Sequence, residues 1–247
     1  MKEVVINTNR LTKKFGSFTA VSNISFDVYA GEIFGFLGAN GAGKTTAMRM
    51  LCGLSIPSSG TASVAGFDVY KETEKIKRNI GYMSQKFSLY EDLTVLENIR
   101  FFAGIYGLRN TAIKQKTDQL VQQLGMQKEL NTLVGALPPG WKQKLAFSVA
   151  ILHDPKIVFL DEPTGGVDPV TRRQFWDLIY AASAASITIF VTTHYMDEAE
   201  YCDRISMMVD GEVKALDSPS QLKKQYKAAS MDDVFFELAR GAKRSAD

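Results

Sequence analysis

A glycine-rich loop at residues 38–45 constrains the fold of this chain more than any other feature. The loop reads Gly-Ala-Asn-Gly-Ala-Gly-Lys-Thr and matches the pattern G-x-x-x-x-G-K-[ST]. The apolar run at residues 32–37 predicts a strand before it, and the closely spaced apolar residues from Met48 to Leu54 predict a helix after it. In that context the glycines let successive backbone N–H groups converge on one anion at the positive end of the helix. The sequence therefore predicts a phosphate-binding loop.

The positions of this loop have separate expected roles. The Lys44 ammonium should reach the β- and γ-phosphates of a nucleotide, and the Thr45 hydroxyl should hold Mg²⁺. The loop residues expected to contact the nucleotide are Gly38, Asn40, Gly41, Ala42, Gly43, Lys44, Thr45 and Thr46.

Two adjacent carboxylates follow a second buried strand pattern. Residues 157–160 read Ile-Val-Phe-Leu and precede Asp161 and Glu162. Open α/β sheets bind ligands beyond the carboxyl ends of their strands. We therefore expect Asp161 to hold Mg²⁺ through water and Glu162 to polarise an attacking water as general base. Apolar runs also end in acids at ordinary surfaces, but the phosphate loop favours the functional interpretation.

Length and composition fit one α/β domain over residues 1–247. We expect a core at 1–87 and 156–217, a helical lobe at 88–155 and a helical tail at 218–247. Strand patterns at 4–7, 24–28, 156–160 and 187–192 flank the helical lobe, whose Thr94 and Glu97 form a predicted capping box.

The two cysteines have no metal-ligand spacing, and the net charge of +2 argues against nucleic acid as a partner. The longest apolar runs are far below the ~20 residues that cross a bilayer, and no secretion signal opens the chain, so we expect a cytoplasmic protein.

Four further segments accompany these elements: Lys14-Phe15-Gly16, Gly81-Tyr82-Met83-Ser84-Gln85, Gly165-Gly166-Val167-Asp168 and Val191-Thr192-Thr193-His194. With the phosphate loop, they resemble the nucleotide-binding domains of ABC transporters from Phe15 to about Gly211. The resemblance implies a P-loop NTPase with a RecA-like core, an N-terminal antiparallel β subdomain and an inserted helical lobe. It also implies ATP and Mg²⁺ as ligands and ATP hydrolysis as the activity.

The resemblance assigns one role to each segment. It implies that Phe15 stacks on adenine, although packing in the core is the alternative for an aromatic residue. Gln85 would contact Mg²⁺ and the attacking water, and a neutral His194 would bond the γ-phosphate. Asp168 would contact the opposite subunit of a dimer. The other histidine, His153, is expected to be solvated or to cap a helix.

The second signature of the family departs from its usual form. The family has Leu-Ser-Gly-Gly-Gln at the start of a helix, and this chain has Leu137-Pro138-Pro139-Gly140-Trp141. In the family the serine hydroxyl and glycine amides bind the γ-phosphate of ATP held by the opposite subunit. Proline has no N–H, although it suits the start of a helix. We expect the segment, with Pro138 and Gly140 among the ATP-binding residues, to close over ATP with fewer hydrogen bonds, and an inactive composite site is the alternative.

This variant signature and the ending Met231-Asp232-Asp233-Val234-Phe235 resemble bacterial ABC-2 type exporters of the drug-efflux kind. The resemblance implies two partners: an ABC-2 type permease, and a second ATP-binding cassette in a homodimer or heterodimer. It also allows a membrane-fusion protein as a further partner. It places the chain at the cytoplasmic face of the bacterial plasma membrane, held there by the permease. The segment 87–92 is expected to contact the permease, with packing between the lobes as the alternative.

Two other functions remain open from the sequence. One is a soluble ABC ATPase without a transport role, which usually carries two cassettes or a long coiled-coil insertion. The other is a catalytically weak subunit kept for binding or assembly.

Overall fold

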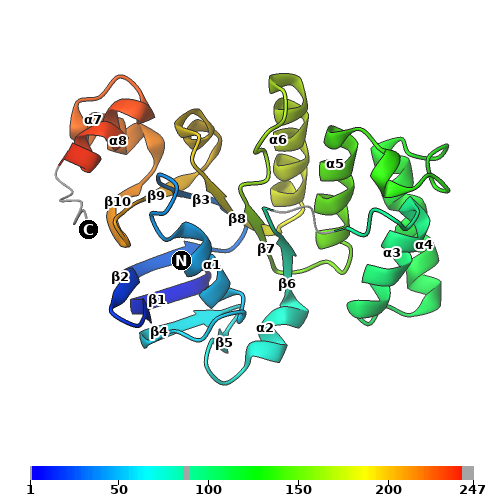
Figure 1. Ribbon diagram of the computed structural model, residues 1–247, viewed down its shortest axis with the longest axis horizontal. Helices are drawn as coiled ribbons and strands as arrows, with labels where there is room; N and C mark the ends of the chain where they lie inside the picture. The colour runs from blue at the N-terminus through cyan, green and yellow to red at the C-terminus, as the bar shows by residue number, and fades with distance from the viewer. Residues whose placement is uncertain (1, 86–88, 241–247) are drawn as a thin grey trace.

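The computed structural model describes residues 2–85 and 89–240 (Figure 1). An antiparallel sheet is built from β1 (Val4–Phe15), β2 (Phe18–Tyr29), β4 (Ser59–Val64) and β5 (Phe67–Asp68). Its strand order is β2-β1-β4-β5. The strands predicted at 4–7 and 24–28 are confirmed, and both are longer than their apolar patterns. They are longer because the β1–β2 pairing continues beyond the short apolar patterns, through Lys13 opposite Val21, until Phe15 pairs with Phe18.

A second sheet carries the predicted buried strands. It contains β3 (Ile33–Leu37), β6 (Ile80–Met83), β7 (Ile157–Asp161), β8 (Thr188–Thr193), β9 (Arg204–Val209) and β10 (Glu212–Asp217). Their order is β10-β9-β3-β8-β7-β6. The neighbours from β9 to β6 run parallel, and β10 is antiparallel to β9. Every residue of β3, β7 and β8 is buried, as continuous apolar runs require in a sheet covered on both faces.

Aromatic side chains join the two sheets. Phe26 of β2 stacks on Phe34 of β3 with 5.5 Å between ring centroids. Phe190 of β8 lies between these rings and Phe159 of β7, at 5.2 to 6.3 Å from them. Helix α1 (Lys44–Leu51) packs on the same core, and α2 (Thr73–Asn79) leads into β6. The loop between β3 and α1 therefore stands on a rigid base.

The predicted helical lobe lies at one end of the molecule (Figure 1). It contains α3 (Val95–Ile105), α4 (Asn110–Leu124), the 3₁₀ turn η1 (Val134–Ala136) and α5 (Pro139–Ala150). The capping box is present: Thr94 Oγ1 accepts from the Glu97 amide, and the Glu97 carboxylate accepts from the Thr94 amide. Gly125 ends α4 with a φ of 68°, the left-handed conformation that favours glycine there.

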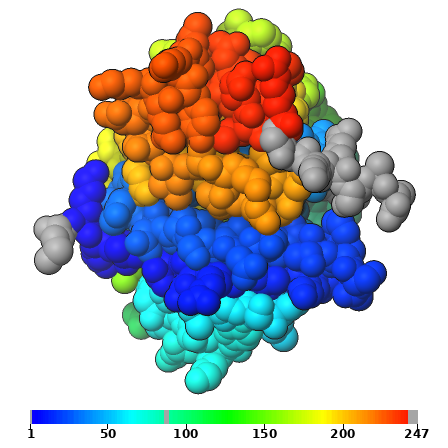
Figure 2. Space-filling model, turned by 90° about the vertical axis from the view of Figure 1, so that its left-hand side faces the viewer, coloured from blue at the N-terminus to red at the C-terminus, as the bar shows by residue number. Residues whose placement is uncertain are grey.

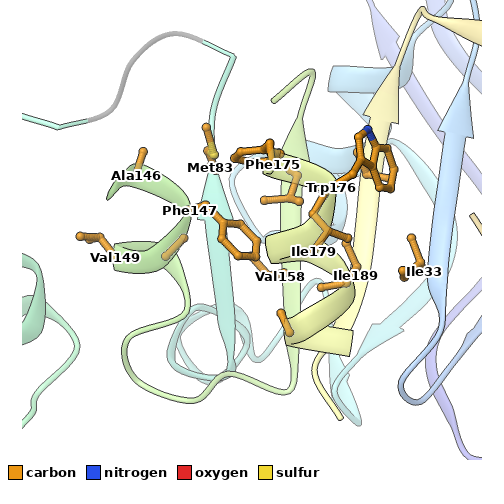
Figure 3. Packing of buried hydrophobic residues seen from close by; sticks show 14 of the residues in the cluster. Ile33, Met83, Ala146, Phe147, Val149, Val158, Phe175, Trp176, Ile179 and Ile189 are labelled. Carbon is orange, nitrogen blue, oxygen red and sulfur yellow. The ribbon is translucent and has the colours of Figure 1, made fainter. Parts of the chain in front are cut away.

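Helix α5 fixes the lobe to the core through α6 (Pro169–Ala184). The Phe147 ring of α5 meets the Phe175 ring of α6 edge to face, with centroids 5.4 Å apart. Figure 3 shows these side chains with Ile179 gathered over Val158 of β7. Because these side chains are almost entirely buried, a displacement of the lobe would also move α6.

The C-terminal elements are η2 (Met196–Tyr201), α7 (Pro219–Tyr226) and α8 (Met231–Arg240). Helices α7 and α8 lie in the described part of the segment after residue 217, where the sequence predicts a helical tail. Figure 2 shows the tail lying over the β9–β10 edge, with the antiparallel sheet below. Leu222, Met231 and Val234 are buried and belong to the main core. Among residues 2–85 and 89–240, no helix is long and apolar enough to cross a membrane.

His153 neither caps a helix nor lies free in solvent: its ring stacks on Tyr106 at 3.8 Å and its Nε2 lies 3.1 Å from the Ile80 carbonyl oxygen. Burial there lowers the pKa of His153.

In the segment expected to contact a permease, residues 87 and 88 lie outside the described residues, while Tyr90 is exposed beside Phe101.

The aromatic core gives a test of stability. We expect Phe190→Ala to lower the free energy of unfolding by ~3–5 kcal/mol, because the substitution leaves a cavity among rings that cannot close it. Phe236 is 56% exposed on α8 and provides a matched control. Phe236→Ala should cost less than ~1 kcal/mol. Urea denaturation measures both values, and equal losses would contradict the assigned core.

Candidate functional site

The loop from Gly38 to Gly43 joins the carboxyl end of β3 to the start of α1, as predicted. Gly43 has a φ of 102°, and a Cβ at this position would lie 2.4 Å from the Ala20 carbonyl oxygen. Only glycine allows this close approach of β2 to the loop. A Cβ on Gly41, whose φ is 81°, would meet open space. Gly43 is thus required by packing, and Gly41 by backbone conformation alone.

Lys44 is folded into the loop. Its side chain is 4% exposed, and Nζ donates to the carbonyl oxygens of Gly38 at 2.8 Å and Ala39 at 3.1 Å. Nζ also lies 3.3 Å from Glu162 Oε1. A buried ammonium needs such partners because its desolvation is costly. The cation is therefore held at the centre of the loop, where the lysine of a phosphate-binding loop acts.

Asp161 lies at the end of β7, next to the loop. Its Oδ1 accepts hydrogen bonds from Thr45 Oγ1 at 3.1 Å and from Thr192 Oγ1 at 2.7 Å. Mg²⁺ takes oxygen ligands and usually combines one or two carboxylates with substrate phosphates and water. The Thr45 hydroxyl and the Asp161 carboxylate fit that donor set. Thr192 was missed by the sequence analysis, because its place depends on the pairing of Asp161 with Thr192 across β7 and β8.

Two ionisable side chains near Asp161, Cys52 and Tyr82, are uncharged. Burial, with the Asp161 carboxylate nearby, raises the pKa of Cys52 well above its usual range. The same causes raise the pKa of Tyr82 to about 12. Both groups stay protonated at neutral pH, so neither provides an anionic ligand that competes with Asp161.

Glu162 brings the predicted catalytic residues together. Its Oε2 lies 3.0 Å from Gln85 Nε2 and 3.0 Å from His194 Nδ1, and its Oε1 faces Lys44. Its backbone has a φ of 48°, which is uncommon for a residue with a side chain. The Glu162 amide donates to both the carbonyl and the hydroxyl oxygen of Thr192 at 3.1 Å, which holds this conformation. The carboxylate is only 8% exposed.

Two hollows meet at Glu162 and Gln85. One, of about 470 Å³, is lined by the phosphate loop residues Asn40, Gly41, Gly43, Lys44, Thr45 and Thr46 together with Phe18, Ala20, Gln85 and Glu162. The other, of about 330 Å³, lies between Glu162, His194 and Gln143 of α5. The Glu162 carboxylate thus lies between the hollow at the phosphate loop and the hollow next to the helical lobe.

Six residues predicted to bind the nucleotide do not line the hollow at the loop: Phe15, Gly38, Ala42, Pro138, Gly140 and Asp168. Phe15 is 56% exposed on the hairpin, with Lys13 Nζ 5.1 Å from its ring centroid, whereas its cross-strand partner Phe18 lines the hollow. Phe15 is therefore not a core residue. Phe18 could not be found from the sequence, because the β1–β2 hairpin alone brings it back beside Phe15.

Pro138 and Gly140 lie at the start of α5, and Asp168 caps α6. Asp168 Oδ1 accepts from the amides of Val170 and Thr171 at 3.0 Å, and Oδ2 accepts from Thr171 Oγ1 at 2.6 Å. A Cβ on Gly140 would lie 2.7 Å from Thr171 Cγ2. The two helix starts are therefore in close contact.

Comparison with known proteins identifies this arrangement. A family model described as "ABC transporter" matches residues 21–165. The chain belongs to the ABC transporter family. It is 47% identical over 237 residues to "Probable multidrug ABC transporter ATP-binding protein YbhF" of Escherichia coli (strain K12), covering 96% of this chain and 41% of YbhF. It is 34% identical over 219 residues to "Linearmycin resistance ATP-binding protein LnrL" of Bacillus subtilis (strain 168), covering 88% of this chain and 70% of LnrL.

A solved structure shares the fold. It is described as a dimeric ATP-binding cassette in a post-hydrolysis state bound to ADP and Pi, and it matches with a TM-score of 0.77 and 25% identity over 86% of this chain and 98% of that one. The predicted P-loop NTPase fold and the resemblance to the nucleotide-binding domains of ABC transporters are confirmed. The chain carries an ABC ATPase domain, and it spans 41% of the length of YbhF.

The close approach at Gly43 gives a test of the loop. We expect Gly43→Ala to weaken binding of a fluorescent ATP analogue by at least about 10-fold, because the added methyl group pushes the loop off β2. Gly104, on α3, has open space around its Cβ position and provides the control. Gly104→Ala should leave the affinity unchanged, and unchanged binding by Gly43→Ala would contradict the geometry of the loop.

Proposed function

We propose that this chain is the ATP-hydrolysing subunit that powers export through an ABC-2 type permease. The observation that carries the proposal is the position of the Glu162 carboxylate. It is buried at the rim of the phosphate loop and held between Lys44, Gln85 and His194. A carboxylate in this position can accept a proton from water next to a bound γ-phosphate.

Binding of ATP would use the loop and the hairpin. The loop amides and Lys44 would surround the β- and γ-phosphates, and Lys44 would exchange the carbonyl oxygens of Gly38 and Ala39 for phosphate oxygens. Adenine would stack on an exposed aromatic ring of the hairpin, Phe15 or Phe18. Thr45 and Asp161, with Gln85, would hold Mg²⁺, which neutralises charge on the phosphates when bound.

Hydrolysis would follow from the groups around Glu162. Its carboxylate accepts a hydrogen bond from a water molecule in line with the γ-phosphorus. The water oxygen bonds to phosphorus as the bond from phosphorus to the ADP oxygen breaks, and one water proton passes to Glu162. Gln85 and His194 hold the carboxylate in place through the hydrogen bonds that they donate to it. The products are ADP and inorganic phosphate.

A second cassette would complete each site, either another copy of this chain or a homologue. The dimeric solved structure supports this arrangement. At the start of α5 the amides of Trp141 and Lys142 donate to the Pro138 carbonyl. Among the described residues the Gly140 amide has no such partner, so it is the donor that this signature offers to the opposite ATP. Asp168 would lie at the same interface.

The export role is supported by the relatives' names, which describe a probable multidrug transporter and a linearmycin resistance protein. The chain would then act at the cytoplasmic face of a bacterial membrane, bound to a permease and, in a larger assembly, to a membrane-fusion protein. Energy would pass through the contact of α5 with α6.

Removal of the Glu162 carboxylate tests this proposal. We expect Glu162→Gln to lower kcat for ATP by ~10²–10⁴-fold in the complex with the permease, because the proton acceptor is lost. The exposed Glu74, on α2, is a matched control, and Glu74→Gln should keep full activity. Unchanged ATPase activity in Glu162→Gln would instead support a catalytically weak assembly subunit.

The proline-containing signature gives a separate test. Pro138→Ser with Pro139→Gly restores an N-cap hydroxyl and an amide donor at the start of α5. We expect ATP-driven dimerisation to increase or stay the same, as measured by analytical ultracentrifugation. A clear loss of dimer would contradict the role of this helix start as a cover for ATP.

A further inference from the structure

A second carboxylate, Glu198, is buried outside the group around Glu162. It lies in η2, and the residue is 0% exposed. Its Oε1 accepts a hydrogen bond from Thr164 Oγ1 at 2.5 Å, and within the described residues Oε2 has no hydrogen-bond partner. A buried carboxylate is costly to desolvate and is a poor way to gain stability. Its position therefore needs another explanation.

The hydrogen bond between Thr164 and Glu198 connects two catalytic segments. Thr164 follows Glu162 by two residues, and Glu198 follows His194 by four. The direct contact of Glu162 with His194 is the other connection between the same segments. The two contacts and the short lengths of chain between them close a ring. In a closed ring neither catalytic side chain can shift without the other.

Arg172 extends this ring to α6. Its Nε lies 3.7 Å from Glu198 Oε1, and its guanidinium carbon lies 4.2 Å from the ring centroid of Tyr195, the residue after His194. Its NH1 lies 3.6 Å from Asp197 Oδ2. Arg172 stands in the first turn of α6, which Asp168 caps. The network of Thr164, Glu198 and Arg172 thus reaches the loop that ends at Asp168.

We propose that Thr164 and Glu198 are positioning residues that hold His194 against Glu162 and fix the loop 165–168 beside them. This inference rests on the proposed ATPase function for its kinetic part. A purely structural ion pair would stabilise the fold without changing the environment of His194. A positioning network changes that environment and kcat, while KM for ATP depends mainly on the phosphate loop.

The variants Thr164→Val and Thr164→Ser separate the two roles, because valine keeps the shape without the hydroxyl and serine retains the hydroxyl. Thr188 provides the matched control: it is equally buried, its hydroxyl accepts from the Gly31 amide at 3.0 Å, and it lies at the amino end of β8, away from His194. In the complex with the permease we expect Thr164→Val to lower kcat by about 10-fold or more. KM should stay within about twofold, Thr164→Ser should recover most of kcat, and Thr188→Val should keep it.

A second measurement does not depend on hydrolysis. The chain has only two histidines, so histidine-labelled NMR gives one signal for His194 and one for His153 as internal reference. We expect Thr164→Val to shift the His194 signal and to leave His153 in place, whereas Thr188→Val shifts neither. An unmoved His194 signal, or a fall in kcat that follows thermal stability in all three variants, would overturn the inference. If the His194 signal shifts but wild-type activity does not depend on Glu162, the proposed ATPase function fails and the positioning network stands.

Discussion

The buried pair formed by Lys44 and Glu162 is the interaction on which the site depends. A cation and a carboxylate, each almost fully removed from water, lie 3.3 Å apart at the junction of β3, β7 and α1. Each has other partners: the lysine has the loop carbonyls, and the glutamate has Gln85 and His194. Such a pair is costly to break by removing one partner, but a bound phosphate group can replace the carboxylate as the partner of the lysine. Once phosphate takes over Lys44, the Glu162 carboxylate is released from this contact and can act as the proposed general base.

The fold explains why these groups meet. Strands β3, β8 and β7 are adjacent and parallel, so their carboxyl ends place the phosphate loop, His194 and the two acids at one edge. The aromatic cluster under β3 and β8 keeps this edge rigid, and Gly43 lets the loop lie against β2. On the far side, the contact of Phe147 with Phe175 links the helical lobe to α6, which begins at Asp168. In the proposed function, movement of the lobe would reach Glu162 through α6 and the loop before it.

Much of this could be read from the sequence, because local patterns carry it. The glycine loop, the buried runs ending in Asp161 and Glu162, and the capping box at Thr94 each depend on neighbouring residues. The contacts that were missed depend on pairing between distant segments. Thr192 reaches Asp161 through the β7–β8 register, Phe18 reaches the loop through the hairpin, and Glu198 meets Thr164 only after both segments fold. The roles of Pro138, Gly140 and Asp168 belong to a second cassette and remain predictions.

The most direct test of this account is an experimental structure of the chain with Mg²⁺ and a non-hydrolysable ATP analogue. In that structure we expect Lys44 Nζ to leave the carbonyl oxygens of Gly38 and Ala39, and Glu162 Oε1, for phosphate oxygens. Glu162 should keep its contact with His194 and face the γ-phosphate. If Lys44 remains on the loop carbonyls, or if Glu162 points away from the γ-phosphate, the Lys44–Glu162 pair is not the site of ATP hydrolysis.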